Sequence, residues 1–359
     1  MNTVESFDGL YVCPLSRSPL RRAGAVLESE TGATRYESIN GIPRFLRFGP
    51  VEDPASESVL QRLNALARDE GWQAALASVY ASDPGMIRYV TESNRGSFID
   101  LLPLRPDSDV LEIGPGLGQF TGPLAHRARS VAALEVVPGQ AEFVATRCRQ
   151  QGLDNVRVAV GGDDCRLPYA DASFDLVVLN LVFEWCASRC VDEEPERVQR
   201  RLLDEMARVL RPGGTLYLAT KNRYALTYVI GKPDEHAHRV RFGNALPRGL
   251  MTWLLRRRGL PRAPGLLHSH DALAGMLRDA GFARSRSFWA TPEMRYPLEY
   301  VPTDTESIRT ARRRSDFVQG DSRSVRALMR WVPAAWVKHF TPGLAFIASK
   351  AGTREPPSQ

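Results

Sequence analysis

The residues best suited to chemistry begin with Val110–Thr121, VLEIGPGLGQFT, an apolar run that enters a glycine-rich turn. Gly114, Gly116 and Gly118 allow the backbone to take positive φ and to approach a ligand closely. A dinucleotide-binding fingerprint would place a third glycine where Gln119 stands. The turn therefore predicts a ligand site of another kind, at the start of a helix.

Carboxylates follow the next two apolar runs. Glu135 ends AALEVV, 19 residues after Gly116, close to the position where nucleotide-binding folds place a ribose-binding acid. Asp163 and Asp164 lie in GDDCRLP, after the run that ends at Val160. Because the carboxyl ends of parallel strands lie along one edge of a sheet, we expect these acids to surround the same ligand.

The spacing G-x-G-x-G after the acidic strand residue Glu112 resembles the first motif of class I S-adenosylmethionine (SAM)-dependent methyltransferases. The resemblance runs from the front segment through RVLRPGGTLYLAT to LAFIASK. It implies that SAM is the cofactor, that Glu135 binds its ribose and that Asp163, or Asp164 if the loop is shifted by one residue, binds its adenine amino group. The full set of cofactor residues that we expect is Glu112, Gly114, Gly116, Gly118, Glu135, Asp163, Asp164 and Asn180.

Within these methyltransferases the chain resembles a bacterial group often linked with saccharide biosynthesis. That group has an Asn-Arg pair after the fifth strand, here Asn222-Arg223, and a Gly-x-x-Asp-x-His element, here Gly231 to His236. The resemblance implies that Asn222, Arg223 and Asp234 bind the methyl acceptor. Lys221 departs from the pattern, because an acid is expected there, and this affects the assignment of the acceptor.

Methyl transfer from a sulfonium is an in-line displacement, so alignment of the reactants supplies much of the acceleration. A hydroxyl acceptor would also benefit from a base within hydrogen-bond reach. The histidine and carboxylate candidates are Glu184, His236, His238, His268 and His270. The resemblance favours His236 and then His238, with Glu184 as a further catalytic candidate. No acidic cluster with ligand spacing accompanies the histidines, so we expect no metal.

The elements that position these residues follow the order of βαβ units, because short β-branched runs alternate with helical patterns from Phe98 to about Thr220. We predict an α/β fold with a doubly wound Rossmann-like sheet. The helix over Arg197–Leu210 is expected to end at Pro212-Gly213-Gly214. The expected strands are Val110–Ile113, Val131–Val136, Val156–Val160, Leu176–Leu179 and Thr215–Ala219.

The chain before residue 98 reads as two accessory parts. Residues 8–46 form a small β-rich module that resembles a zinc ribbon, but Ser16 stands where the partner of Cys13 belongs and no second cysteine pair follows. A structural zinc site needs four ligands, so we expect this module to hold no zinc. The predicted domains are a module over 1–50, a helical linker over 51–97, a methyltransferase domain over 98–350 and a disordered tail over 351–359.

The segment 221–267 is too long for an ordinary loop, and we expect it to form a subdomain or lid. Residues 221–262 carry ten Lys/Arg and two Asp/Glu, and residues 305–339 carry eight and three, whereas the whole chain has a net charge of +6. The basicity therefore lies in two stretches, and an anionic partner should bind there. NALPRGLMTWLLRRRGL suits either a lid helix with a solvated arginine end or a lipid–water interface.

These patterns favour an enzyme that methylates a hydroxyl of a small molecule or glycan, anionic and linked to a phosphate or a lipid carrier. RNA methylation is the rival, supported by an isoelectric point near 9.2, although no RNA-binding motif is recognisable. A SAM-binding partner protein without catalysis is the third alternative. We expect a cytoplasmic protein with reduced cysteines, because no secretory signal is visible and its five cysteines are scattered.

Overall fold

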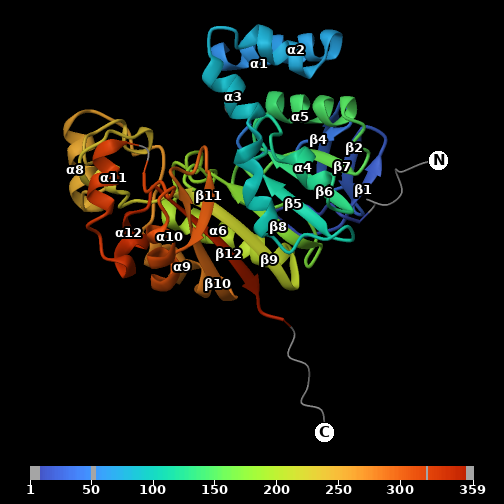
Figure 1. The fold of residues 1–359 in the computed structure, drawn as a ribbon. Coiled ribbons are helices and arrows are strands. Elements are labelled where there is room, and N and C mark those ends of the chain that lie inside the picture. Colours follow the sequence, from blue (N-terminus) through green and yellow to red (C-terminus); the bar gives the residue numbers. More distant parts are fainter. Residues whose placement is uncertain (1–8, 50–53, 321, 353–359) are drawn as a thin grey trace. The chain divides into compact units, whose positions relative to one another are not determined.

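The computed structural model describes residues 9–49, 54–320 and 322–352 (Figure 1). The described residues do not include the first eight residues, to which the prediction on a secretory signal applies. They also do not include most of the predicted tail. Two compact units make up the protein. The first contains the residues up to Val178, Asp204–Thr215 and Gly352, and the second contains Leu179–Leu203 and Leu216–Ala351.

The front of the first unit is the β-rich module that the sequence predicted. Its antiparallel sheet has the order β1-β2-β3-β4, with β1 at Leu20–Ala23, β2 at Val26–Ser29, β3 at Arg35–Ile39 and β4 at Ile42–Pro43. Backbone hydrogen bonds from Val12 N to Pro168 O (3.1 Å) and from Phe45 N to Val160 O (2.7 Å) join the module to the rest of the unit. It is therefore part of the first unit rather than a separate body at residues 1–50.

The linker is helical, as predicted. It contains α1 (Pro54–Glu70), α2 (Trp72–Val79), α3 (Pro84–Thr91) and the 3₁₀ helix η2 (Ser93–Leu101). Leu63 of α1 and Leu76 of α2 are almost fully buried in one apolar cluster with Phe143 of α5 (Pro138–Gln150). The helical spacing of these apolar positions thus packs the linker against the same unit.

The larger sheet contains five consecutive strands in the order β7-β6-β5-β8-β9, of which β5, β6 and β7 lie in the first unit and pair in parallel. These strands are β5 (Asp109–Ile113), β6 (Ser130–Glu135), β7 (Val156–Val160), β8 (Phe174–Asn180) and β9 (Leu210–Lys221). In the parallel ladders Val110 pairs with Val131, and Val131 pairs with Val156. These valines are buried, as expected of strands covered on both faces. The β-strand predictions are confirmed apart from their ends.

One boundary prediction was wrong. The helix α6 covers Pro195–Val209, and β9 already begins at Leu210, so Pro212-Gly213-Gly214 lies inside the strand rather than closing the helix. The reason is that Arg211 is held among the strands by ion pairs to Asp175 (2.7 Å) and Asp109 (2.9 Å). The strand β6, which was predicted to end at Val136, ends one residue earlier, at Glu135.

The second unit contains three further strands. They are β12 (Gly343–Lys350), β10 (Phe282–Thr291) and β11 (Glu299–Pro302). The strand β10 pairs antiparallel with both of the others. The complete strand order is β11-β10-β12-β9-β8-β5-β6-β7, which makes an eight-stranded mixed sheet. The predicted α/β Rossmann-like class with a β-rich front module is confirmed.

The lid segment 221–267 is a folded part of the second unit. It contains α7 (Leu226–Val229), η3 (Glu235–Ala237) and α8 (Arg248–Arg257), and Ala237, Val240, Met251 and Leu255 form a small apolar core of its own. The other helices of this unit are α9 (His270–Asp279), α10 (Thr305–Arg313), α11 (Arg323–Met329), η4 (Ala334–Trp336) and α12 (Val337–Phe340). In the described part of the chain no helix is both long and apolar enough to cross a bilayer.

Candidate active site

The glycine-rich turn of the first unit connects β5 to α4 (Thr121–Ala125). Gly114, Gly116 and Gly118 all have positive φ, at 71°, 58° and 76°. At Gly118 a Cβ atom would also lie 3.3 Å from a methyl group of Val144, so the turn has no room for a side chain there. The glycines therefore take the backbone conformation that the motif predicted, and binding of a ligand at this turn stays a prediction.

Glu135 connects this turn to the end of β6. One carboxylate oxygen accepts a hydrogen bond from Gly116 N (2.9 Å), and the other accepts from Val136 N (2.8 Å) and Val137 N (3.1 Å). Glu135 thus positions the glycine-rich turn, and its contact with a ribose stays a prediction.

Glu112, within β5, is only 2% exposed and accepts a hydrogen bond from the Thr121 hydroxyl (2.6 Å). Burial raises the pKa of this carboxyl to about 7, and the nearby charge of Glu135 acts in the same direction. Its other oxygen, Oε1, has no hydrogen-bond partner among the described residues. Glu112 therefore positions the first residue of α4 and keeps one polar atom available.

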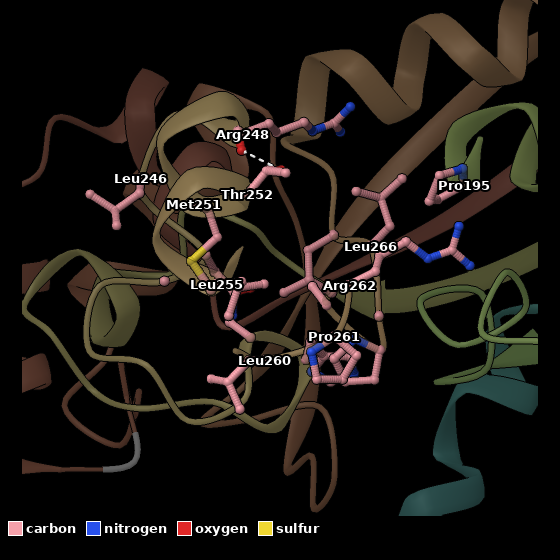
Figure 2. Close-up of a pocket in the computed structure, with 18 of the residues that line it drawn as sticks. Pro195, Leu246, Arg248, Met251, Thr252, Leu255, Leu260, Pro261, Arg262 and Leu266 are labelled. Atoms are coloured by element: carbon pink, nitrogen blue, oxygen red, sulfur yellow. Dashed lines mark hydrogen bonds between the residues drawn. The ribbon is translucent and has the colours of Figure 1, made fainter. Parts of the chain in front are cut away.

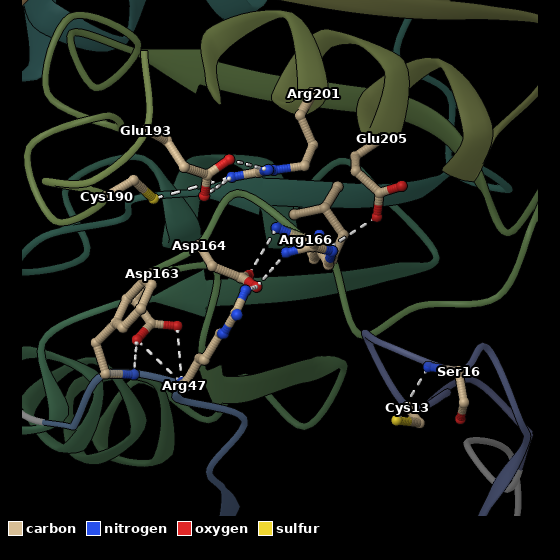
Figure 3. A network of polar contacts seen from close by, with 12 residues as sticks. Cys13, Ser16, Arg47, Asp163, Asp164, Arg166, Cys190, Glu193, Arg201 and Glu205 are labelled. Atoms are coloured by element: carbon tan, nitrogen blue, oxygen red, sulfur yellow. Dashed lines mark hydrogen bonds and ion pairs between the residues drawn. The ribbon is translucent and has the colours of Figure 1, made fainter. Parts of the chain in front are cut away.

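Asp163 and Asp164 hold the segment that leaves the front module (Figure 3). The Asp163 carboxylate accepts from the backbone N–H groups of Arg47 (3.0 Å) and Phe48 (2.7 Å). Asp164 accepts from the backbone (3.1 Å) and guanidinium (2.6 Å) of Arg166, and the Arg47 guanidinium lies 3.5 Å away. No local pattern predicted the contact of Arg47 and Phe48 with these acids, because more than 100 residues separate them. Asn180, the last expected cofactor residue, ends β8 and is half-buried.

The second unit contains a cavity of about 470 Å³, formed mainly by the lid (Figure 2). Its apolar lining includes Leu246, Met251, Leu255, Leu260 and Leu266. Its ionisable lining consists of Arg223, Arg248, Arg256, Arg262, Glu194 and His236. The cavity is thus both apolar and strongly cationic, and its volume lies within the range of small-molecule sites.

His236 brings a buried imidazole to this cavity. Its Nδ1 lies 2.5 Å from Asp234 Oδ1, and the side chain is fully buried. Burial of Asp234 opposes ionisation, but hydrogen bonds from His236 and Tyr228 outweigh it and hold the pKa of this carboxyl well below its usual range. Nδ1 can therefore donate to a carboxylate, and in that tautomer Nε2 carries the lone pair of the ring. Nε2 has no hydrogen-bond partner among the described residues.

The groups around the pair fix its geometry. Asp234 also accepts from Tyr228 (2.6 Å), Asn244 (3.1 Å) and Lys221 (3.2 Å), and the Trp185 ring centroid lies 4.1 Å from that of His236. Lys221 therefore compensates the charge of Asp234, which accounts for a cation at the position where the sequence pattern suggested an acid. Tyr228, Asn244 and Trp185 gave no signal in the sequence, because their role depends on packing within the lid.

Glu184 lies beside Nε2 of His236 and, like it, is buried. Its Oε1 is 4.0 Å from His236 Nε2, and its other oxygen accepts from the Thr220 hydroxyl (2.8 Å). Burial raises the pKa of the Glu184 carboxyl. The structure thus brings together two of the predicted catalytic residues, Glu184 and His236.

The other predicted histidines lie elsewhere in the second unit. His238 Nε2 is 3.1 Å from the Arg262 carbonyl. His268 is hydrogen-bonded through Nε2 to Gln199 Oε1 (2.6 Å), and burial lowers the pKa of His268 to about 4. His270 is bonded to Ser287 (2.9 Å). None of these three lines the cavity.

The residues predicted to bind the methyl acceptor lie in different environments. Arg223 lines the cavity while it donates to the carbonyls of Asn244 (3.0 Å) and Leu246 (2.8 Å). Asn222 is fully buried away from the cavity and donates to the carbonyls of His339 and Thr341 (3.0 Å each). Asp234 contacts His236 rather than the cavity space. Among residues 9–49, 54–320 and 322–352, no group of three His, Cys, Asp or Glu side chains could hold a metal ion.

Comparison with known families gives a match to a methyltransferase domain over residues 111–218. The malonyl-[acyl-carrier protein] O-methyltransferase of Methylococcus capsulatus is 34% identical over 148 residues, which cover 41% of this chain and 48% of that protein. Methyltransferase GfsG of Streptomyces halstedii is 29% identical over 242 residues, which cover 58% of this chain and 79% of that protein.

The biotin biosynthesis bifunctional protein BioHC of Cellvibrio japonicus is 37% identical over 145 residues, or 40% of this chain and 25% of that protein. The matches to BioHC and the Methylococcus enzyme thus span between a quarter and about half of those relatives. Among solved structures, a Haloferax volcanii complex of the Trm112 methyltransferase activator with a putative methyltransferase has a TM-score of 0.42 at 18% identity. That match covers 84% of this chain and 99% of the solved chain.

Proposed function

We propose that this chain, which contains a SAM-dependent methyltransferase domain with SAM as its cofactor, methylates a hydroxyl group of an anionic small molecule or glycan. The features of the first unit that support cofactor binding are its glycine-rich turn, the Glu135 carboxylate that accepts from Gly116 N, and the Glu112 oxygen without a hydrogen-bond partner among the described residues. SAM supplies an electrophilic methyl group on a sulfonium. The second unit, in this proposal, binds and activates the acceptor.

The observation that carries the proposal is the Asp234–His236 pair at the arginine-lined cavity. Asp234 holds the Nδ1 proton, so Nε2 can take the proton of an acceptor hydroxyl while the hydroxyl oxygen forms its bond to the methyl carbon. The carbon–sulfur bond breaks in the same displacement, which yields a methyl ether and the demethylated cofactor. The charge of the resulting imidazolium is balanced by Asp234, with Glu184 4.0 Å from the ring.

The lining of the cavity supports the class of acceptor. Arg223, Arg248 and Arg262 line it, and guanidinium groups bind phosphate or carboxylate oxygens through paired hydrogen bonds. Arg223 and Arg262 also donate to backbone carbonyls and Arg248 donates to Glu196 (2.7 Å), so an anion would use their remaining N–H groups. Leu246, Met251 and other apolar side chains share the same space. We therefore infer an acceptor with an anionic group and an apolar part, such as a glycan on a phosphorylated lipid carrier.

Substitution of His236 tests this assignment. His236→Ala should lower turnover by roughly 10² to 10⁴-fold, because general-base assistance is lost. Calorimetry should show unchanged affinity for SAM, whereas Glu135→Ala should weaken SAM binding. His238→Ala is the matched control and should leave turnover unchanged, since His238 does not line the cavity and its ring contacts a backbone carbonyl, that of Arg262. Full turnover in His236→Ala would contradict the proposed base.

A carboxylate acceptor is the second candidate. The arginine lining would suit a carboxylate equally well, and relatives include enzymes named malonyl-[acyl-carrier protein] O-methyltransferase. A carboxylate needs no base at neutral pH, because it is already ionised. Its methylation would therefore survive His236→Ala but fall when Arg223 or Arg248 is replaced by alanine, and the product would be an ester that mild alkali cleaves.

A further inference from the structure

A second exposed surface of the second unit lies far along the chain from the lid. It covers residues 322–341, with α11, η4 and α12 (Figure 1). Trp331 is 86% exposed, Trp336 is 60% exposed and Leu328 is 44% exposed. Large apolar side chains with this exposure, close together in one segment, indicate an interaction site.

The segment is fixed in place by its opposite side. Val325, Met329 and Val337 are almost fully buried in an apolar cluster with Trp289 and Ile308. The Arg312 guanidinium donates to the carbonyls of Val332 (2.7 Å) and Met329 (2.6 Å), which hold the turn between α11 and η4. The outward position of the two tryptophans therefore follows from how the segment is packed.

The charged residues of this segment are all basic. Residues 322–341 contain Arg323, Arg326, Arg330 and Lys338 and no Asp or Glu. The three arginines are exposed. Lys338 is half-buried, with its ammonium group 3.7 Å from Asp271. The exposed tryptophans are thus interleaved with cations in a stretch that has no acid to neutralise them.

We propose that the 322–341 surface binds the face of an anionic lipid bilayer. Tryptophan prefers the boundary between headgroups and acyl chains, where its ring is buried and its N–H stays hydrated. Arginines near an anionic membrane surface add electrostatic attraction to the binding. Residues 322–341 expose two tryptophans and three arginines, so this segment supplies both the apolar anchoring and the electrostatic attraction. The interaction is peripheral, since the helices concerned are only seven, three and four residues long.

This surface is distinct from α8 of the lid, which the sequence suggested for a lipid interface. On α8, Leu250 is 47% exposed and Trp253 is 52% exposed, but the Arg257 guanidinium lies over the Trp253 ring, 5.4 Å from its centroid. Trp253 therefore already has a cationic partner within its own helix. It provides a matched control for Trp331 and Trp336.

Vesicle sedimentation with the full chain tests the proposal. The protein should bind vesicles rich in phosphatidylglycerol, bind phosphatidylcholine vesicles much more weakly, and lose affinity as salt is raised. Trp331→Ala/Trp336→Ala should lower the partition coefficient by about tenfold or more, because two apolar anchors are lost. Arg326→Gln/Arg330→Gln should weaken binding to the anionic vesicles alone. Trp253→Ala should bind like the unaltered protein.

Several results would overturn the proposal. They are equal binding to both kinds of vesicle, unchanged binding of the double tryptophan variant, and loss of binding in Trp253→Ala alone. A dimer in light scattering that disappears in the double variant would assign the surface to a second copy of the chain. Competition by free glycerol phosphate would assign it to a soluble phosphate instead. Because both tryptophans are exposed, unchanged thermal unfolding of the double variant should confirm that its fold is intact.

Discussion

At the scale of single residues, the close packing around His236 depends on Gly265. A Cβ atom at position 265 would collide with the His236 ring and lie 3.1 Å from the Glu184 carbonyl. The backbone N–H of the following residue, Leu266, donates to that carbonyl (2.9 Å), so this loop segment cannot move away freely. The imidazole can keep its position only while residue 265 has no side chain.

We therefore predict that Gly265→Ala displaces the imidazole and lowers turnover by at least tenfold, with SAM affinity retained. The size follows from the sensitivity of catalysis to small errors in position. Gly249→Ala in α8 is the matched control, because nothing lies within 4 Å of the Cβ that it would add. Steady-state kinetics with calorimetry measure both variants, and equal turnover for the two would contradict the assigned role of His236.

Glu112 makes the stability of the first unit depend on pH. Its pKa is raised from 4.5 to about 7 by burial, so the folded protein holds a proton there that the unfolded chain has already lost between these values. The contribution of this group to stability is complete below pH 4.5 and falls as the pH rises through about 7. The loss amounts to about 3 kcal/mol at most.

Glu112→Gln should remove this dependence, because the amide does not ionise and can still accept from Thr121. We expect the free energy of unfolding of the variant to exceed that of the unaltered protein at pH 8 by more than at pH 5. Denaturant titrations without SAM at the two pH values measure the difference. The exposed Glu57→Gln serves as control, and parallel pH profiles for Glu112→Gln and the unaltered protein would refute the argument.

At the scale of elements, the sequence predicted what depends on local pattern. The strands of the first unit and the helical linker follow from β-branched runs and from the spacing of residues such as Leu63. The glycine-rich turn was predicted because the glycine spacing that allows positive φ lies within one short segment. The start of β9 was predicted five residues too late, since it depends on the ion pairs of Arg211 with Asp109 and Asp175 in other strands.

The candidate site was predicted only in part for the same reason. His236 and Asp234 stand two residues apart, so a family resemblance could identify them together. The hydrogen bonds of Asp163 to Arg47 and Phe48 join residues more than 100 positions apart, and no local pattern encodes them. Asn222 was expected to bind the acceptor, but its amide is used to hold the carbonyls of residues 339 and 341.

The front module is predicted to hold no zinc. Cys13 has hydrogen-bond contacts with Ser16 N (3.4 Å) and Tyr36 Oη (3.2 Å). Burial works against ionisation of this thiol, yet the hydrogen bonds from Ser16 and Tyr36 lower its pKa to about 7. One thiolate supplies only one of the four ligands that a structural zinc needs.

We predict that the purified protein contains no stoichiometric zinc and that Cys13→Ala unfolds at the same temperature with or without a chelator. Elemental analysis by mass spectrometry gives the metal content. One zinc per chain that survives mild chelation and is lost in Cys13→Ala would show that the module is a metal site after all.

At the scale of the whole molecule, the two units carry different chemical roles. The cofactor features lie in the first unit, where acids and backbone N–H groups surround the glycine-rich turn. The cavity of the second unit is formed mainly by the lid, and residues 221–262 of that segment have a net charge of +8. An anionic acceptor is the partner that this distribution of charge favours.

The central claim is that the protein transfers the methyl group of SAM to an anionic small molecule or glycan. The most direct test is incubation with SAM labelled in its methyl group and with separate extracts of RNA, lipid and saccharide. We predict that label enters the lipid or saccharide fraction in an alkali-stable linkage and that His236→Ala abolishes this incorporation. Label found only in RNA, or no label in any fraction although calorimetry shows that SAM binds, would contradict the account.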